Sequence, residues 1–102
     1  MKVIIAGSRE VTEQNEVNRI IKESNFHITE VVSGETRGVD KCGENWANKH
    51  NIPIIKFPAK WNIHGRLAGF KRNVQMSEYA DGLIAIRKLS AKNKGTDNMI
   101  AV

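Results

Sequence analysis

The chain has a single cysteine and no long hydrophobic run. Cys42 has no second cysteine to pair with, so an internal disulfide is excluded and a reducing compartment is indicated. No apolar run approaches the roughly 18 residues of a membrane span, and the first apolar segment is too short for a signal peptide. We therefore expect a cytoplasmic protein that does not enter a membrane, with Cys42 packed in its core.

Aromatic residues and metal-ligand patterns are also scarce. The chain has two tryptophans, one tyrosine and three phenylalanines, which leaves few side chains that could stack on bases. The histidines, His27, His50 and His64, have neither the spacing of metal ligands nor a cysteine pair beside them. The sequence thus predicts no metal site and no cofactor.

Acidic residues are outnumbered by basic ones. Sixteen Lys and Arg against eleven Asp and Glu give a formal net charge of +5. Residues 56–94 carry nine basic and two acidic side chains, a local charge of +7, so the remaining residues sum to −2. This asymmetry suits a surface that faces an anionic partner, but a solvated basic face that favours solubility explains it equally well.

Short β-branched runs alternate with segments of helical periodicity. The strand-like runs cover residues 2–6, 28–32, 53–57 and 82–86. Helical spacing covers 13–24 and 39–50, resumes at Leu67, Phe70, Val74 and Ser77 after a loop at 60–65, and opens a last helix at 95–97. Alternation of this kind predicts one α/β domain over residues 1–102, with a parallel four-stranded sheet and helices on both faces.

A glycine-rich turn at residues 33–40 joins the second strand to the second helix. Gly34 and Gly38 would allow positive φ and a close approach of a ligand to the backbone. Thr36 offers a hydroxyl donor and Arg37 a two-pronged cation, while the helix directs free N–H groups at the same place. The turn therefore favours phosphate binding, although any strand-to-helix connection can need glycine.

Three further turns share the sheet edge with this one. In a parallel sheet the strand-to-helix turns lie at the carboxyl ends of the strands, where ligands bind. The turns at residues 7–9, 61–66 and 90–96 each combine glycine with a hydroxyl, basic or aromatic side chain. Four such turns at one edge strengthen the prediction of a binding site.

Together, these turns resemble those of the SLOG superfamily of Rossmann-like nucleotide-binding domains, most closely its small YspA-related branch. The resemblance spans nearly the whole chain and is carried by residues 3–9, 32–40, 57–61, 65–69, 72–76, 80–85 and 95–100. It implies a small Rossmann-like three-layer sandwich with strand order 3-2-1-4. It also implies a nucleotide or nucleotide-derived ligand, for example of the ADP-ribose type, with its phosphates near the two glycine turns.

The expected ligand contacts divide by their chemistry. The backbone of the glycine turns would hold phosphates, which Arg9, Arg37 and Arg72 would neutralise. Asp40 would accept a hydrogen bond from a ribose hydroxyl, and Trp61 would stack on a base unless it only covers the third helix. The full expected set is Gly7, Ser8, Arg9, Ser33, Gly34, Thr36, Arg37, Gly38, Asp40, Trp61, Arg72, Asn73, Gly95 and Thr96.

Two other members of the superfamily imply alternative functions. LOG-type phosphoribohydrolases carry an Arg-Lys-x-x-Met motif, which residues 72–76 match except at Asn73, and a later motif that ends in a catalytic glutamate. Met99 stands at the position of that glutamate. Methionine can neither stabilise an oxocarbenium ion nor handle water, so we expect binding without catalytic residues and keep N-glycosidic cleavage as the alternative.

The second alternative is single-stranded nucleic acid. DprA, which binds single-stranded DNA, resembles the chain at residues 33–40 and 70–73. The basic span and Trp61 would suit a strand, because cationic grooves follow phosphates and aromatic rings stack on bases.

The sequence also favours self-association. Larger relatives continue with a full helix and another strand, whereas this chain ends about two turns into its last helix. A four-stranded sheet without that extension would leave an edge and apolar surface uncovered. We therefore expect a homo-oligomer.

Overall fold

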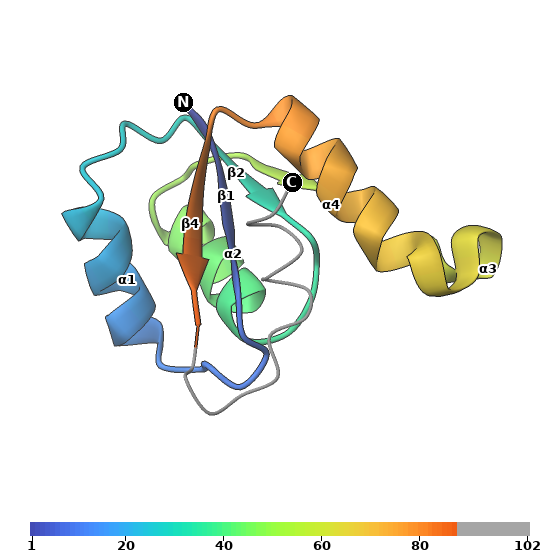
Figure 1. Ribbon diagram of the computed structural model, residues 1–102. Helices are drawn as coiled ribbons and strands as arrows, with labels where there is room; N and C mark the ends of the chain where they lie inside the picture. The colour runs from blue at the N-terminus through green and yellow to red at the C-terminus, as the bar shows by residue number, and fades with distance from the viewer. Residues whose placement is uncertain (88–102) are drawn as a thin grey trace.

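Strands and helices alternate along the chain (Figure 1). The computed structural model describes residues 1–87. Its strands are β1 (Lys2–Gly7), β2 (Glu30–Ser33), β3 (Ile54–Lys56) and β4 (Gly82–Ile86). Its helices are α1 (Gln14–Glu23), α2 (Val39–Lys49), α3 (Trp61–His64), the 3₁₀ helix η1 (Gly65–Leu67) and α4 (Ala68–Tyr79). The turn at 90–96 and the last helix that the sequence predicts lie outside the described residues.

The four strands form one parallel sheet in the order β3-β2-β1-β4. This confirms the predicted α/β fold and its strand order. In the register, Val3 of β1 lies beside Val31 of β2, and Ile4 of β1 lies beside Leu83 of β4. Parallel neighbours need crossover connections, which the helices supply. All four strands therefore end at the same edge, where the β1–α1 and β2–α2 turns lie.

The sheet buries side chains on both of its faces. Alternate residues of β1 point in opposite directions, so Val3 and Ile5 belong to one core cluster and Ile4 and Ala6 to the other. Residues of α1 and α2 complete the first cluster, and Met76 of α4 completes the second. Helices thus cover both faces of the sheet, as the sequence predicts. Cys42 of α2 is buried in the first cluster, which confirms its expected place in the core.

An asparagine with positive φ follows each of the helices α1 and α2. Asn25 comes just after α1 with φ of 58°, and Asn51 comes just after α2 with φ of 56°. Asparagine tolerates this left-handed conformation better than most residues, so it ends a helix at low cost. The helices predicted at 13–24 and 39–50 agree closely with the observed bounds.

The segment before α4 is helical, so the loop predicted at residues 60–65 is wrong. α3 and η1 occupy residues 61–67, and Gly65, with φ of 55°, turns the chain between them. Figure 1 shows α3 and the start of α4 extending beyond the sheet. A helix of four residues makes little more than one turn, so it leaves no periodic pattern in the sequence.

The buried face of α4 is not the face that its apolar spacing indicates. Leu67 and Phe70, which predict the helix, are exposed on its outer side. The buried residues of α4 are Ala68, Arg72, Asn73 and Met76. Arg72 faces inward because it bonds to the backbone of the turn at the end of β2, and the buried Asn73 accepts a hydrogen bond from Arg72.

Candidate functional site

The β1–α1 and β2–α2 turns touch at the carboxyl edge of the sheet. The carbonyl oxygen of Ser8 accepts hydrogen bonds from the N–H groups of Val11 and Val39, and each N···O distance is 3.3 Å. Gly38 lies against this contact, since a Cβ at its position would be 2.3 Å from the Ser8 carbonyl oxygen and 2.6 Å from Arg9 Cα. Its φ of 81° is a second reason for glycine. The start of α2 is thus anchored on the neighbouring turn.

The end of β4 holds the β1–α1 turn from the other side. The N–H of Ser8 donates a hydrogen bond of 3.0 Å to the carbonyl oxygen of Ile86. A Cβ on Gly7 would lie 2.0 Å from the same oxygen, so no larger residue fits there. The buried Ser8 hydroxyl accepts a bond of 3.3 Å from the N–H of Glu10. Gly7 and Ser8 therefore shape the turn.

A buried hydroxyl–carboxylate pair supports the β2–α2 turn. The Ser33 hydroxyl donates a hydrogen bond of 2.6 Å to Glu44 Oε2, and Ser33 Oγ accepts one of 3.1 Å from the N–H of Glu35. Ser33 and Glu44 are both buried. A charge-assisted bond in such a place is stronger than one in water, so it fixes the direction in which the chain leaves β2.

The positive φ predicted for Gly34 is wrong, because Glu35 adopts it instead, at 60°. Gly34 is needed for space. A Cβ on Gly34 would lie 2.7 Å from Arg72 Nη1 and 3.1 Å from Asp40 Oδ2. The Glu35 side chain is exposed, and its Oε1 lies 3.7 Å from Lys56 Nζ.

Arg72 ties α4 to this turn. Its Nη1 donates a hydrogen bond of 2.6 Å to the carbonyl oxygen of Gly34, and its Nε donates one of 2.9 Å to Asn73 Oδ1. Burial lowers the pKa of the guanidinium, attraction to Asp40 opposes that effect, and repulsion from Arg9 adds to it. An anion bound at this edge would relieve the repulsion between the two arginines.

Asp40 lies beneath the turn in the first turn of α2 and is buried. Burial raises the pKa of its carboxyl group, while the Thr36 hydroxyl, the charge of Arg72 and the backbone of Gly7 oppose the rise. A carboxylate here also complements the positive end of the helix dipole. This geometry favours a supporting role for Asp40 over the ribose contact expected for it.

The expected residues within the described chain divide by exposure. Arg9, Arg37 and Trp61 are exposed, and Gly7 and Thr36 are half-buried. The buried ones are Ser8, Ser33, Gly34, Gly38, Asp40, Arg72 and Asn73. Gly95 and Thr96 lie outside the described residues. The exposed side chains can reach a ligand, whereas the hydrogen bonds of Ser8, Ser33 and Arg72 support the turns.

Trp61 lies in helix α3 and not in a turn. Its indole is 57% exposed, and its Cη2 atom lies 3.6 Å from where a Cβ on Gly69 would be. The same position on Gly69 is 3.9 Å from Arg72 Nη2. The exposed ring therefore lies on the same side of α4 as Arg72, and part of it covers the helix.

Sequence reasoning missed Glu44. This carboxylate lies four residues after Asp40 on the same face of α2, and both are buried toward the β2–α2 turn. The sequence does contain a signal for it. Asp40 and Glu44 are four residues apart and therefore share one face of the helix, and acids are rarely buried unless they have partners.

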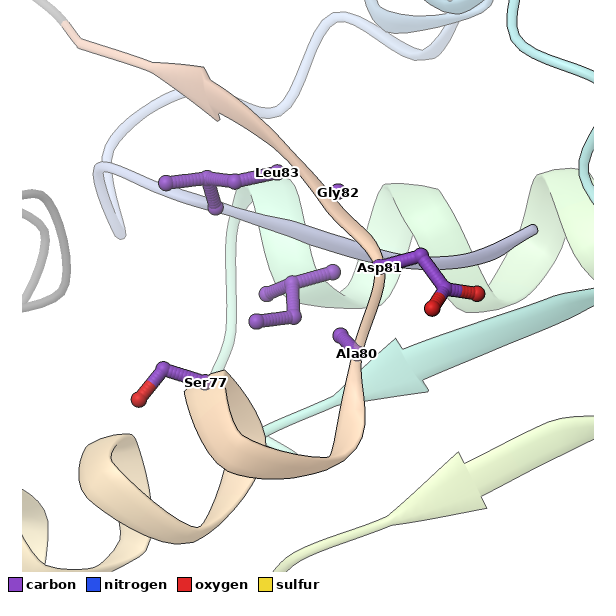
Figure 2. Close-up of a pocket in the computed structure, with 6 residues that line it drawn as sticks. Ser77, Ala80, Asp81, Gly82 and Leu83 are labelled. Carbon is purple, nitrogen blue, oxygen red and sulfur yellow. The ribbon is translucent and has the colours of Figure 1, made fainter.

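A small hollow lies away from these turns, next to the start of β4. It has a volume of about 190 Å³ and is lined by Ile4, Ser77, Ala80, Asp81, Gly82 and Leu83. Figure 2 shows these residues around the connection between α4 and β4, which is the opposite edge of the sheet from the arginines. The hollow therefore does not coincide with the β1–α1 and β2–α2 turns.

Two features are absent from residues 1–87. Within residues 1–87, no three potential metal-ligating side chains form a cluster. Over the same range, no helix combines the length and the apolar composition that crossing a membrane requires.

The family of the chain follows from a comparison with protein-family profiles. Neither curated proteins nor solved structures include a match to the chain. The sequence profile of the YspA- and cpYpsA-related SLOG family matches residues 1–64, a range that includes the β1–α1 and β2–α2 turns. The chain belongs to this YspA- and cpYpsA-related SLOG family.

Proposed function

We propose that the protein binds the phosphate groups of a nucleotide or nucleotide-derived molecule, such as one of the ADP-ribose type, at the two adjoining turns. The observation that carries this proposal is the position of Arg9, Arg37 and Arg72 around a glycine turn. Membership of the SLOG family, which suggests nucleotide-related binding or a function like that of LOG or DprA proteins, supports it.

The three arginines have different roles in this proposal. Arg9 and Arg37 are exposed and contact phosphate oxygens directly, since guanidinium groups bind such oxygens in two-pronged fashion. Arg72 is buried and holds the carbonyl of Gly34, so that the turn keeps its shape and gains positive potential. The positive end of the α2 dipole adds to the attraction of an anion.

The exposed ring of Trp61 supports a nucleotide over a simple phosphate. It lies on the side of α4 that carries Arg72, with more than half of its surface free for contact. Stacking of a base on an aromatic ring adds affinity for any base, because every base has a π face. In this proposal Trp61 holds the base while the turns hold the phosphates.

The two buried carboxylates favour binding over bond cleavage. Glu44 bonds to the Ser33 hydroxyl, and Asp40 interacts with Thr36 and Arg72. A hydrolase needs a carboxylate that can reach the water or the sugar. We therefore propose that the protein senses or sequesters its ligand. Release of free base from a nucleoside monophosphate, measured by chromatography, would instead support N-glycosidic cleavage.

Calorimetric titration with a panel of nucleotides that includes ADP-ribose tests the proposal. We expect saturable binding by the wild type and affinity weakened roughly 10-fold or more in Arg9→Ala and Arg37→Ala, because each loses a charge-assisted contact. Arg19→Ala is the matched control, since Arg19 is an exposed arginine of α1 that pairs with Glu16 and Glu23. No binding by the wild type, or equal affinities in all variants, would contradict it.

An oligonucleotide titration separates this proposal from nucleic-acid binding. If a single strand is the ligand, its affinity falls steeply with salt and exceeds that of a mononucleotide. If the proposed site holds a nucleotide, ADP-ribose competes with weakly bound oligonucleotide, and the mononucleotide keeps its affinity at salt concentrations that release the strand.

A further inference from the structure

Exposed apolar side chains gather on one short segment of the described chain. Within residues 1–87, the large apolar side chains that are most exposed are Met1, Phe26, Trp61, Ile63, Leu67 and Phe70. Four of these six belong to residues 61–70. Ile63 is 66% exposed, Leu67 58% and Phe70 48%. Scattered apolar residues are ordinary on a surface, but a group of this kind indicates a contact.

Of these four, Leu67 and Phe70 lie on the outer side of α4 and its approach, whereas Trp61 lies on the side that carries Arg72. Leu67, Phe70 and Val74 follow one another at spacings of three and four residues, so they form one stripe along the helix. The opposite face, which includes Ala68, Arg72 and Met76, already packs toward the sheet. Ile63, on the neighbouring helix α3, is also exposed. Among the described residues 1–87, Leu67 and Phe70 on this side stay exposed.

We propose that the outer face of α4, formed by Phe70 and the half-buried Val74 together with Leu67 just before the helix, is the contact of a homodimer in which two α4 helices pack antiparallel. Spacings of three and four residues are those with which two helices interlock their side chains. One patch that meets its own copy closes the assembly by a two-fold axis, which is the commonest symmetry of small oligomers.

Charge favours the antiparallel direction and a second copy. Arg66 and Lys71 are exposed toward the start of the stripe, and Glu78 is exposed toward its end. In an antiparallel pair, the basic start of one helix meets the acidic end of the other. A parallel pair would place like charges together, which costs affinity and specificity.

The proposal is separate from ligand binding, because Arg9 and Arg37 belong to the turns at the sheet edge and not to the outer face of α4. The proposed partner is a second copy of the same chain, so the dimer can be tested with the purified protein alone. Sedimentation velocity over a range of concentrations, without nucleotide, measures the association directly.

We expect the full chain to sediment as a dimer at high concentration and to dissociate on dilution. Phe70→Glu and Leu67→Glu should each weaken the dimer 100-fold or more, roughly the effect of placing a charge in an apolar contact. Phe26→Glu is the matched control, since Phe26 is exposed before β2 and should leave the dimer unchanged. Circular dichroism checks that each variant is folded.

Exchange of charges tests the direction of the pair. Lys71→Glu and Glu78→Lys should each weaken the dimer about 10-fold, and the double variant should recover most of the wild-type affinity. A wild type that stays monomeric at every concentration, or a dimer that Phe70→Glu leaves intact, would overturn the proposal. A double variant weaker than either single variant would overturn the antiparallel arrangement.

Discussion

Arg72 Nη1 donates a hydrogen bond of 2.6 Å to the carbonyl oxygen of Gly34, although 38 positions separate the two residues in the sequence. The bond joins a helix on one face of the sheet to the turn that leads to a helix on the other face. It also explains why glycine is required at position 34, since a side chain there would meet the guanidinium. The shape of the proposed site therefore depends on packing at a distance.

Gly34→Ala should destabilise the fold by about 1–3 kcal/mol, because its Cβ would lie 2.7 Å from Arg72 Nη1 and must displace it. Urea unfolding measures the change. Gly69→Ala is the control, since its Cβ would lie 3.6 Å from Trp61 and the helix should gain about 1 kcal/mol. Equal stability of Gly34→Ala and the wild type would mean that Arg72 does not hold the turn as described.

Ser33→Ala should cost about 1–3 kcal/mol, because it leaves the buried Glu44 carboxylate without its 2.6 Å partner. Glu44→Gln in the same chain should restore part of the loss, since an amide is less costly to bury than a carboxylate. A double-mutant cycle by thermal unfolding measures the coupling. If the two effects simply add, the pair is not a coupled unit.

Asp40 should make stability fall as pH rises. Burial raises the pKa of its carboxyl group above the ordinary 3.8, so the folded state binds the proton more tightly than the unfolded state. Between 3.8 and the raised pKa, the folded state therefore carries more protons, and the free energy of unfolding falls with increasing pH.

Comparison with Asp40→Asn isolates this group. The wild type should lose stability relative to the variant as pH rises above about 4, the ordinary range of a carboxyl group. Urea unfolding at several pH values between 4 and 7 follows the difference. A wild type that gains stability over Asp40→Asn through this range would show that the Thr36 and Arg72 contacts outweigh burial.

Trp61→Ala should weaken the binding of ADP-ribose about 5- to 100-fold, the worth of one stacked base, without changing the affinity for inorganic pyrophosphate. The indole is mostly exposed, so the fold should keep its stability. Trp61→Phe should retain most of the affinity, because it keeps an aromatic face. If Trp61→Ala lost affinity for the nucleotide and for pyrophosphate to the same extent, Trp61 would support the turns and not stack on the base.

The fold can be predicted because the apolar patterns of the strands and the glycine turn both indicate it. β1 is a continuous apolar run, as expected of a central parallel strand that is buried on both faces, and its alternate residues enter two cores. The glycine turn is recognisable because Gly34 and Gly38 stand between a β-branched run and a segment of helical periodicity. These are local signals, so one sequence contains enough to find them.

The inner layer of the site depends on contacts that local patterns do not contain. Arg72 reaches Gly34 only after α4 packs on the sheet, and its helix was predicted from Leu67 and Phe70, which lie outside. Glu44 meets Ser33 only after α2 packs against β2. Apolar periodicity therefore finds the helix α4, but the polar contacts decide which face is buried.

Nuclear magnetic resonance titration of the ¹⁵N-labelled protein with ADP-ribose tests the central claim most directly, because it reports every backbone amide at once. We expect saturable shifts that are largest at Ser8, Arg9 and residues 34–38, and the loss of those shifts in Arg37→Ala. Shifts confined to the opposite edge, around Gly82 and Leu83, or no shifts at millimolar ADP-ribose, would contradict it.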